Sequence, residues 1–268
     1  MGVLNLTPDS FSDGGRYTDP GAALKRARTI ALEGARIIDI GGESTRPGSI
    51  GISLDEELRR VLPVLEQLTE LEVSVPISVD TSKAGVASRA IELGAVMIND
   101  VTAFRADPAL VEVVAESGAS VCLMHMLGEP RTMQENPRYH DVVSEVARFL
   151  ESRLEFAVDS GIEEERICLD PGIGFGKTAE HNIELLSRLG ELCVLGRPIL
   201  VGVSRKRFLA RILGDPEGTR GPLAAGVTLA VLAYERGASI IRAHDVREHV
   251  EALAAARALG AVGLTEAH

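Results

Sequence analysis

The chain has 268 residues, of which 45% are hydrophobic and 25% charged, a composition that suits one barrel or two modest domains. A net charge of −11, the lack of tryptophan and the 3% aromatic content argue against a nucleic-acid-binding surface. No apolar run reaches the roughly 18 residues of a membrane span, and the first residues lack the pattern of a secretory signal. We therefore expect a cytoplasmic protein without nucleic-acid or membrane partners.

The three cysteines, Cys122, Cys168 and Cys193, are isolated in apolar stretches. Their odd number and the absence of Cys-x-x-Cys spacing argue against a disulfide framework or a zinc site. We expect all three to be buried, reduced thiols.

Short apolar runs alternate with longer amphipathic runs from one end of the chain to the other. The pattern predicts strands at residues 2–7, 36–40, 75–79, 96–98, 120–124, 166–169, 198–203 and 239–242. It predicts helices at residues 20–34, 54–71, 82–93, 108–117, 142–160, 179–192, 205–236 and 245–259. Glycines mark the expected helix ends at Gly34, Gly94, Gly118, Gly161, Gly237 and Gly260. Eight strand-helix units without a linker predict a single (β/α)8 TIM barrel over residues 1–268, with a doubly wound open sheet as the alternative.

The first predicted strand leads into a loop of unusual composition, residues 5–15, which read NLTPDSFSDGG. Pro8 cannot extend the hydrogen-bond ladder of a strand, so the strand must end near Thr7. Barrels and parallel sheets carry their chemistry on loops at the carboxyl ends of strands. A long solvated turn explains this segment equally well.

Polar residues also follow each of the other predicted strands. They occupy residues 41–48, 80–81, 99–100, 125–126, 170–177, 204–207 and 242–245. Because the carboxyl ends of all strands meet at one rim of a barrel, we expect these eight segments to form a single pocket.

The glycine-rich segment after the sixth strand, residues 170–178 (DPGIGFGKT), is not a nucleotide-binding loop. A Walker A motif needs four residues between its first glycine and the Gly-Lys pair, whereas Gly172 and Gly176 are separated by three. Lys177 also stands where the dinucleotide fingerprint requires glycine. A structural turn would explain the glycines, but it would not explain Asp170 at the strand end.

Asp80, Asn99 and Asp170 each lie at the end of a strongly apolar strand. A single aspartate in such a place is often a helix N-cap, as Asp80 or Thr81 could be. Three such residues form a set of acceptors aimed at one point. We expect their ligand to be a heterocycle with a guanidine-like edge, since a carboxylate accepts adjacent N–H groups in pairs.

Cations gather after the last two strands, in the segments 204–207 (SRKR) and 242–244 (RAH). Barrels often bind phosphate at this position, and strand alternation places Arg242 and His244 on the same side. A solvated helix start is the other interpretation of the Arg-Lys-Arg run. The helix dipole disfavours cations at that end, so a bound anion would offset them.

In order and place, these segments resemble those of the bacterial dihydropteroate synthases, a family of pterin-binding barrels. The resemblance covers essentially the whole chain and rests on residues 5–15, 41–48, 80–81, 99–100, 124–126, 170–175, 204–206 and 242–245. It implies a homodimeric (β/α)8 barrel that joins 6-hydroxymethyl-7,8-dihydropterin diphosphate to 4-aminobenzoate, giving 7,8-dihydropteroate and pyrophosphate.

The resemblance also implies a role for individual residues. The pterin pocket would comprise Asp80, Asn99, Met124, Asp170, Gly202 and Lys206. The diphosphate would bind to Arg242 and His244, with Asn5 as a ligand of a Mg²⁺ cofactor. The aminobenzoate pocket would comprise Phe11, Asp13, Thr45, Arg46, Pro47, Phe175 and Arg207, although many family members have Ser in place of Arg207. The catalytic residues would be Asp13, Asp80, Lys206, Arg242 and His244.

Three other functions fit parts of the pattern. A methyltetrahydrofolate-dependent barrel that methylates a corrinoid protein would share Asp80, Asn99 and Asp170 but would not need the diphosphate cluster. A carbonyl-acting barrel could use Lys206 as a Schiff-base amine. A pterin-binding paralogue without turnover would keep the binding residues alone.

Overall fold

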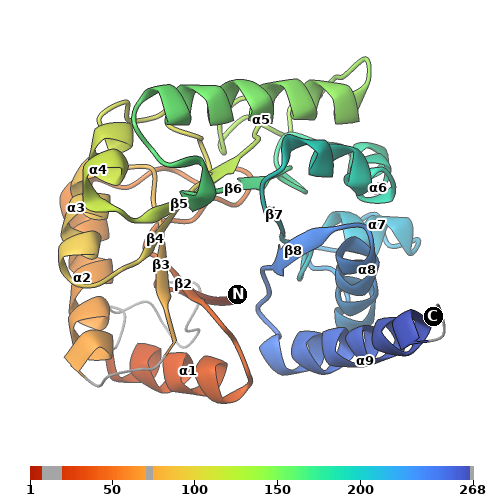
Figure 1. The fold of residues 1–268 in the computed structure, drawn as a ribbon, viewed down its shortest axis with the longest axis horizontal. Coiled ribbons are helices and arrows are strands. Elements are labelled where there is room, and N and C mark those ends of the chain that lie inside the picture. The colour runs from red at the N-terminus through yellow and green to blue at the C-terminus, as the bar shows by residue number, and fades with distance from the viewer. Residues whose placement is uncertain (8–19, 71–74, 266–268) are drawn as a thin grey trace.

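In the computed structural model, which describes residues 1–7, 20–70 and 75–265, eight parallel strands form one sheet in the order β1 to β8 (Figure 1). The strands are β1 (Gly2–Asn5), β2 (Ile38–Gly41), β3 (Ile77–Asp80), β4 (Met97–Asp100), β5 (Ser120–Met124), β6 (Ile167–Asp170), β7 (Ile199–Val201) and β8 (Ala238–Ile241). Each of them overlaps one predicted strand.

The α-helices lie around the outside of the strands (Figure 1). They are α1 (Pro20–Leu32), α2 (Leu54–Glu70), α3 (Ala84–Glu92), α4 (Leu110–Ser117), α5 (Val142–Asp159), α6 (Ala179–Ser187), α7 (Phe208–Ile212), α8 (Leu223–Glu235) and α9 (Val246–Thr265). Two 3₁₀ helices, η2 (Glu164–Arg166) and η3 (Leu189–Leu195), precede β6 and β7.

The sheet closes through the residues that follow β8. The backbone N–H of Ala243 donates to Met1 O at 2.9 Å, and Val3 N–H donates to Ala243 O at 3.0 Å. Gly2 and Ala243 thereby form a parallel bridge between β1 and the segment that follows β8. This closure confirms the predicted TIM barrel and rules out the open sheet.

Strand alternation divides the core into two layers. Residues such as Ile40, Val79, Ile98 and Leu169 pack into the large core shared with the helices. The intervening residues face inward and form a smaller cluster of Met97, Cys122, Cys168 and Leu200, with Met1 and Ile240 packed against it. This cluster fills the lower part of the barrel, below the carboxyl-terminal ends of the strands.

Several sequence predictions were wrong. The predicted helical region 205–236 is two helices, α7 and α8, because the intervening segment contains Gly214, Gly218 and the Gly221-Pro222 pair, which break a helix. Gly260 does not end the last helix, which continues to Thr265. Cys193 is exposed, unlike Cys122 and Cys168.

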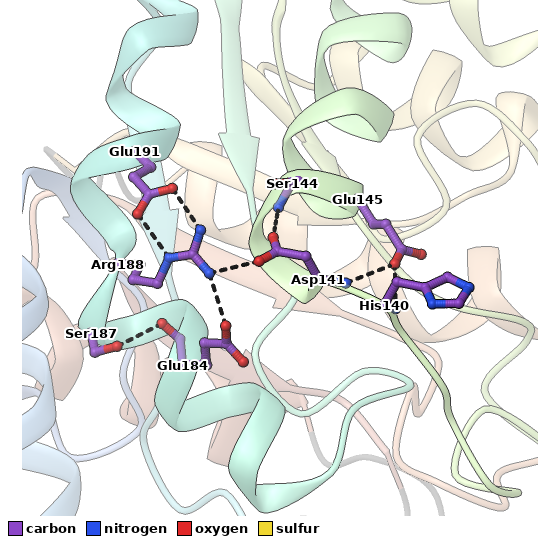
Figure 2. Close-up of polar contacts among 8 residues, drawn as sticks. All are labelled: His140, Asp141, Ser144, Glu145, Glu184, Ser187, Arg188 and Glu191. Atoms are coloured by element: carbon purple, nitrogen blue, oxygen red, sulfur yellow. Dashed lines mark hydrogen bonds and ion pairs between the residues drawn. The ribbon is translucent and has the colours of Figure 1, made fainter.

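Polar side chains tie α5 to the elements beside it (Figure 2). Asp141 caps α5 by accepting from Ser144 N–H and also accepts from Arg188 at 2.9 Å. Arg188 in turn binds Glu184 on α6 and Glu191 on η3. These groups are largely exposed, so the network fixes local geometry more than it adds stability. Within the described residues, no helix is long and apolar enough to cross a membrane.

Candidate active site

The interior face of the barrel changes from apolar to polar within one step along the strands. Met97, Cys122, Cys168 and Leu200 form the apolar layer. The next inward-facing residues along the chain are Asn99, Met124 and Asp170 on β4, β5 and β6, and Gly202 directly after β7. The sheet register places Asp80 beside Asn99 and Met124 beside Asp170. Four of the predicted pterin residues therefore come together because each lies two residues beyond a residue of the apolar layer, and Asp80 joins them through its register with Asn99.

A charged network lies at the centre of this layer. Arg242, just after β8, donates from Nε to Asp39 Oδ2 at 2.7 Å and from Nη2 to Asp80 Oδ2 at 2.9 Å. Asn99 donates from Nδ2 to the same Asp39 oxygen at 3.1 Å. Asp39, on β2, has no exposed surface. The sequence analysis missed this residue, although a carboxylate inside the apolar run RIIDI is itself unusual.

Burial governs the protonation of the acidic groups. Loss of solvent raises the pKa of Asp80 to about 7, against the opposing effect of Arg242 and with the support of Asp39. Burial also raises the pKa of Asp170, although the Gly172 N–H, which donates to Asp170 Oδ1 at 2.7 Å, acts in the opposite direction. Both carboxylates can accept hydrogen bonds from a ligand, and a cationic or N–H-rich ligand would favour their ionised forms.

The glycine loop, residues 171–177, is held by a buried lysine. Lys177 Nζ lies 2.8 Å from His125 Nδ1 and donates to the carbonyl oxygens of Gly172 and Phe175 at 3.0 Å each. Burial lowers the pKa of Lys177 to about 7. A side chain at position 172, where φ is +68°, would place its Cβ 1.8 Å from His125 O, so only glycine fits at this position of the loop.

This loop presents an aromatic ring to Lys206, the cation that is predicted to bind the pterin. Lys206 Nζ lies 4.1 Å from the centroid of the Phe175 ring. Burial, with the nearby Arg242, lowers the pKa of Lys206 to about 8, while Asp170 and Asp80 favour its charged form. Met124 lies in the same apolar cluster as Val101, Met126 and Met133, against which Phe175 packs. The structure thus brings Phe175, Lys206, Met124 and Asp170 together.

The predicted diphosphate cluster is only partly free to bind an anion. Arg205 is paired with Asp245, and Arg207 is exposed. The backbone N–H of His244 donates to Ser204 Oγ at 3.2 Å. Burial and the nearby cation Arg242 lower the pKa of His244 to about 3, so its ring is neutral near pH 7.

The loop after β2 reaches across the rim. Gly48 N–H donates to Pro130 O at 3.1 Å, and Thr45 lines a cavity of about 910 Å³ whose wall includes Asp80. Arg46 and Pro47 are exposed. The predicted residues Phe11 and Asp13 lie outside the described residues.

A second cluster anchors the base of this loop. Lys83, at the start of α3, pairs with Glu57 at 2.5 Å and with Glu43. Glu57 is fully buried, whereas Lys83 is half-buried. Because Glu43 precedes Thr45 by two residues, this pairing fixes where the loop leaves the barrel.

Within the part of the chain that the structure describes, Asn5 is the main candidate ligand for a magnesium ion. Its Oδ1 lies beside the backbone of Gly41, 3.7 Å from where a Cβ would be, and Asp80 Oδ2 lies at the same distance from that point. Among the described residues no group of three His, Cys, Asp or Glu could hold a metal. A single amide oxygen still fits Mg²⁺, which keeps several waters and commonly binds through substrate phosphates.

The spacing of His140, His181, His249 and His268 in the sequence is not typical of a metal site and predicts surface residues, but for His249 this prediction is wrong. It is buried, and its Nδ1 lies 2.6 Å from the carbonyl oxygen of Asp245, the residue that precedes α9. His125, which belongs to the predicted rim segment 125–126, is buried against Lys177, so it supports the glycine loop.

Comparison with known proteins agrees with this geometry. Residues 1–244 match the family model described as "Pterin binding enzyme". The dihydropteroate synthase of Escherichia coli K12 is 48% identical over 255 residues, which cover 94% of this chain and 88% of the relative. Two structures of dihydropteroate synthase from Xanthomonas albilineans are also similar. The one with 4-aminobenzoic acid has a TM-score of 0.88 and 46% identity, and covers 97% of this chain and 92% of its own.

The Xanthomonas structure in complex with 7,8-dihydropteroate has a TM-score of 0.85 and 43% identity, with coverage of 97% of this chain and 92% of its own. The family model, the Escherichia coli relative and the two Xanthomonas structures point to the same kind of protein, and the barrel topology agrees with them. Together with the polar rim described above, they show that this chain belongs to the pterin-binding enzyme family, among the dihydropteroate synthases.

Proposed function

We propose that this enzyme, a transferase, condenses 6-hydroxymethyl-7,8-dihydropterin diphosphate with 4-aminobenzoate to form 7,8-dihydropteroate and pyrophosphate. The observation that carries the proposal is the ring of inward-facing acceptors on β3, β4 and β6, which meets an arginine from the end of β8 in one pocket. The similar Xanthomonas structures with 4-aminobenzoic acid and 7,8-dihydropteroate support the choice of substrates.

In this proposal the pterin ring lies between the acceptor residues Asp80, Asn99 and Asp170. Carboxylates accept the paired N–H groups of its guanidine-like edge. As the C–O bond to the diphosphate breaks, positive charge develops on the pterin methylene and spreads into the ring. Asp80 and Asp170 stabilise that charge, because fixed acceptors in a water-poor site act most strongly where charge develops.

The departing diphosphate would be received by Arg242 and His244. Two of the five N–H groups of the Arg242 guanidinium donate to Asp39 and Asp80, which leaves three for phosphate oxygens. The neutral ring of His244 can donate one further hydrogen bond. A magnesium ion near Asn5 would supply charge neutralisation at the diphosphate oxygens.

The aromatic amine of 4-aminobenzoate is uncharged at neutral pH, so its attack on the methylene requires no dedicated base. We place the aminobenzoate near Phe175 and Arg207, beneath the loop that carries Thr45, Arg46 and Pro47. This loop and the segment containing Phe11 and Asp13 would complete the pocket after the anionic pterin substrate has bound, which predicts ordered binding. Tight binding of 4-aminobenzoate to the protein without pterin substrate or pyrophosphate would contradict this order.

We also propose that the protein acts as a homodimer in the cytoplasm. Apolar side chains at the end of α7 and the start of α8 support a partner surface there, since Leu213, which follows α7, is 62% exposed and Leu223, the first residue of α8, is 43% exposed. Light scattering on the purified protein should give twice the mass of the chain, and a monomeric mass would contradict the dimer.

The decisive experiment measures pyrophosphate release with both substrates present and with each one omitted. The proposal requires release that depends on both substrates and on magnesium, with 7,8-dihydropteroate as the second product. Binding of the pterin substrate without release would indicate a silent pterin-binding paralogue. Borohydride trapping of a carbonyl substrate on Lys206 would instead indicate Schiff-base chemistry.

A further inference from the structure

Asp39 lies at the centre of the charged network but in none of the polar segments that follow the strands. It is the third inward-facing charged group beside Asp80 and Arg242, and it reaches them from the middle of β2. Asp39 lies inside the barrel and has no exposed surface. Any contact with substrate would therefore have to pass through its neighbours.

The two oxygens of Asp39 have different environments. Oδ2 accepts from both Arg242 Nε and Asn99 Nδ2. Among the residues that the structure describes, none donates a hydrogen bond to Oδ1. A buried carboxylate with one unsatisfied oxygen costs stability, and a well-packed apolar residue would avoid that cost. Stability alone therefore does not explain an aspartate at this position.

The contact with Asp39 determines how the amide of Asn99 is turned. A carboxylate can only accept hydrogen bonds, so Asn99 must direct its NH₂ group toward Asp39. Its carbonyl oxygen is then left for a ligand. Asn99 thus offers an acceptor, as do Asp80 and Asp170, and not a donor that would oppose the N–H groups of a pterin.

Asp39 also determines where Arg242 lies. The bond from Nε holds the guanidinium on the β2 side of the barrel, while Nη2 bonds Asp80 on β3. This two-point attachment fixes the plane of the guanidinium and hence the direction of its three remaining N–H groups.

We propose that Asp39 is a positioning residue for the condensation: it sets the amide polarity of Asn99 toward the pterin and aligns Arg242 with the diphosphate. The proposal rests on the proposed function. Asp39 acts through these two side chains and does not touch substrate.

The experiment compares Asp39→Asn with the swapped double variant Asp39→Asn/Asn99→Asp. In the single variant the amide at position 39 can donate, so Asn99 can turn and face the ligand with NH₂. Calorimetry with 6-hydroxymethyl-7,8-dihydropterin, which lacks diphosphate, should show at least about a tenfold loss of affinity. In the swap, the carboxylate at position 99 accepts from the amide at position 39 and again presents an acceptor, so affinity should return to within about threefold of the wild type.

Asp100→Asn is the matched control. Asp100 is also fully buried and lies on β4, but its carboxylate serves Ser82, Thr102 and the Phe104 N–H. Its headgroup affinity should stay within about threefold of the wild type. The pH dependence of headgroup binding adds a readout that a change in packing would not shift. The charge of Asp39 raises the pKa of Asp80, as do, to a smaller extent, those of Glu57 and Asp100, so the acid limb of binding should shift to lower pH in Asp39→Asn, and by more than in Asp100→Asn.

Wild-type headgroup affinity in folded Asp39→Asn would overturn the proposal, as would a folded swap variant that binds no better than the single variant. If Asp39→Asn does not fold, the swap, which keeps both the charge and the hydrogen bond, is compared with the wild type: headgroup affinity within about threefold supports the proposal, and a loss of at least about tenfold overturns it. A wild-type protein that releases no pyrophosphate would count against the proposed function. A fully active enzyme with indifferent Asp39 variants would count against the positioning role alone.

Discussion

Replacing Asp80 by Asn should make the protein more stable relative to wild type as the pH rises. Burial raises the pKa of Asp80 from its ordinary value of 3.8 to about 7 in the folded protein. Between pH 3.8 and pH 7 the folded state holds a proton on Asp80 that the unfolded state has lost. The free energy of unfolding therefore falls as the pH rises through this window, and Asp80 causes no further change above pH 7. An amide at position 80 removes that titration.

The magnitude follows from the width of the window. Each pH unit corresponds to about 1.4 kcal/mol, so between pH 5 and pH 7 the wild type should lose about 2–3 kcal/mol relative to Asp80→Asn. The lowered pKa values of His244 and His125 act in the opposite direction over part of this range. Both proteins contain these histidines, so their contribution cancels in the difference between the two unfolding free energies.

The assay is urea unfolding of both proteins at pH 5 and pH 8, with matched m-values as the check for two-state behaviour. The unfolding free energy of Asp80→Asn, taken relative to the wild type, should be higher at pH 8 than at pH 5. The variant should nevertheless lose turnover, because an acceptor for the pterin becomes a donor. A difference that is independent of pH, or that moves in favour of the wild type, would refute the burial argument.

Three further substitutions probe the rest of the site. Arg242→Ala should destabilise the protein by about 3–5 kcal/mol, because two buried carboxylates lose their cation, and should lower kcat by orders of magnitude. Thermal melts and pyrophosphate release are measured on one preparation, and a fully active variant would refute this prediction. Asp170→Asn should weaken binding of the pterin headgroup by about 2–4 kcal/mol in calorimetry, and unchanged affinity would remove Asp170 from the site. Lys177→Met should cost at least about 2 kcal/mol in urea unfolding and raise KM for the pterin substrate, because the carbonyls of Gly172 and Phe175 lose their donor; an unchanged KM would show that Lys177 does not hold the loop for substrate.

Local sequence determined the order and type of nearly every element of the barrel. Apolar runs of three to six residues, separated by amphipathic runs, suffice to predict strands and helices, because the periodicity of side-chain burial is a local property. The polar residues at strand ends could likewise be assigned to one rim once a barrel was inferred, because closure brings all carboxyl ends together. Asp80, Asn99 and Asp170 were assigned to the rim in this way.

Contacts across the barrel could not be read from the chain. Arg242 and Asp39 are 203 residues apart, and their pairing depends on the register that joins eight strands and on the closure of Met1–Val3 against Ala243. The pairing of Lys177 with His125 likewise joins loops of adjacent strands. The sequence therefore determined which residues reach the rim. Only the tertiary structure decided which charges neutralise one another and which remain for a ligand, because that depends on distances set by closure and not by local pattern.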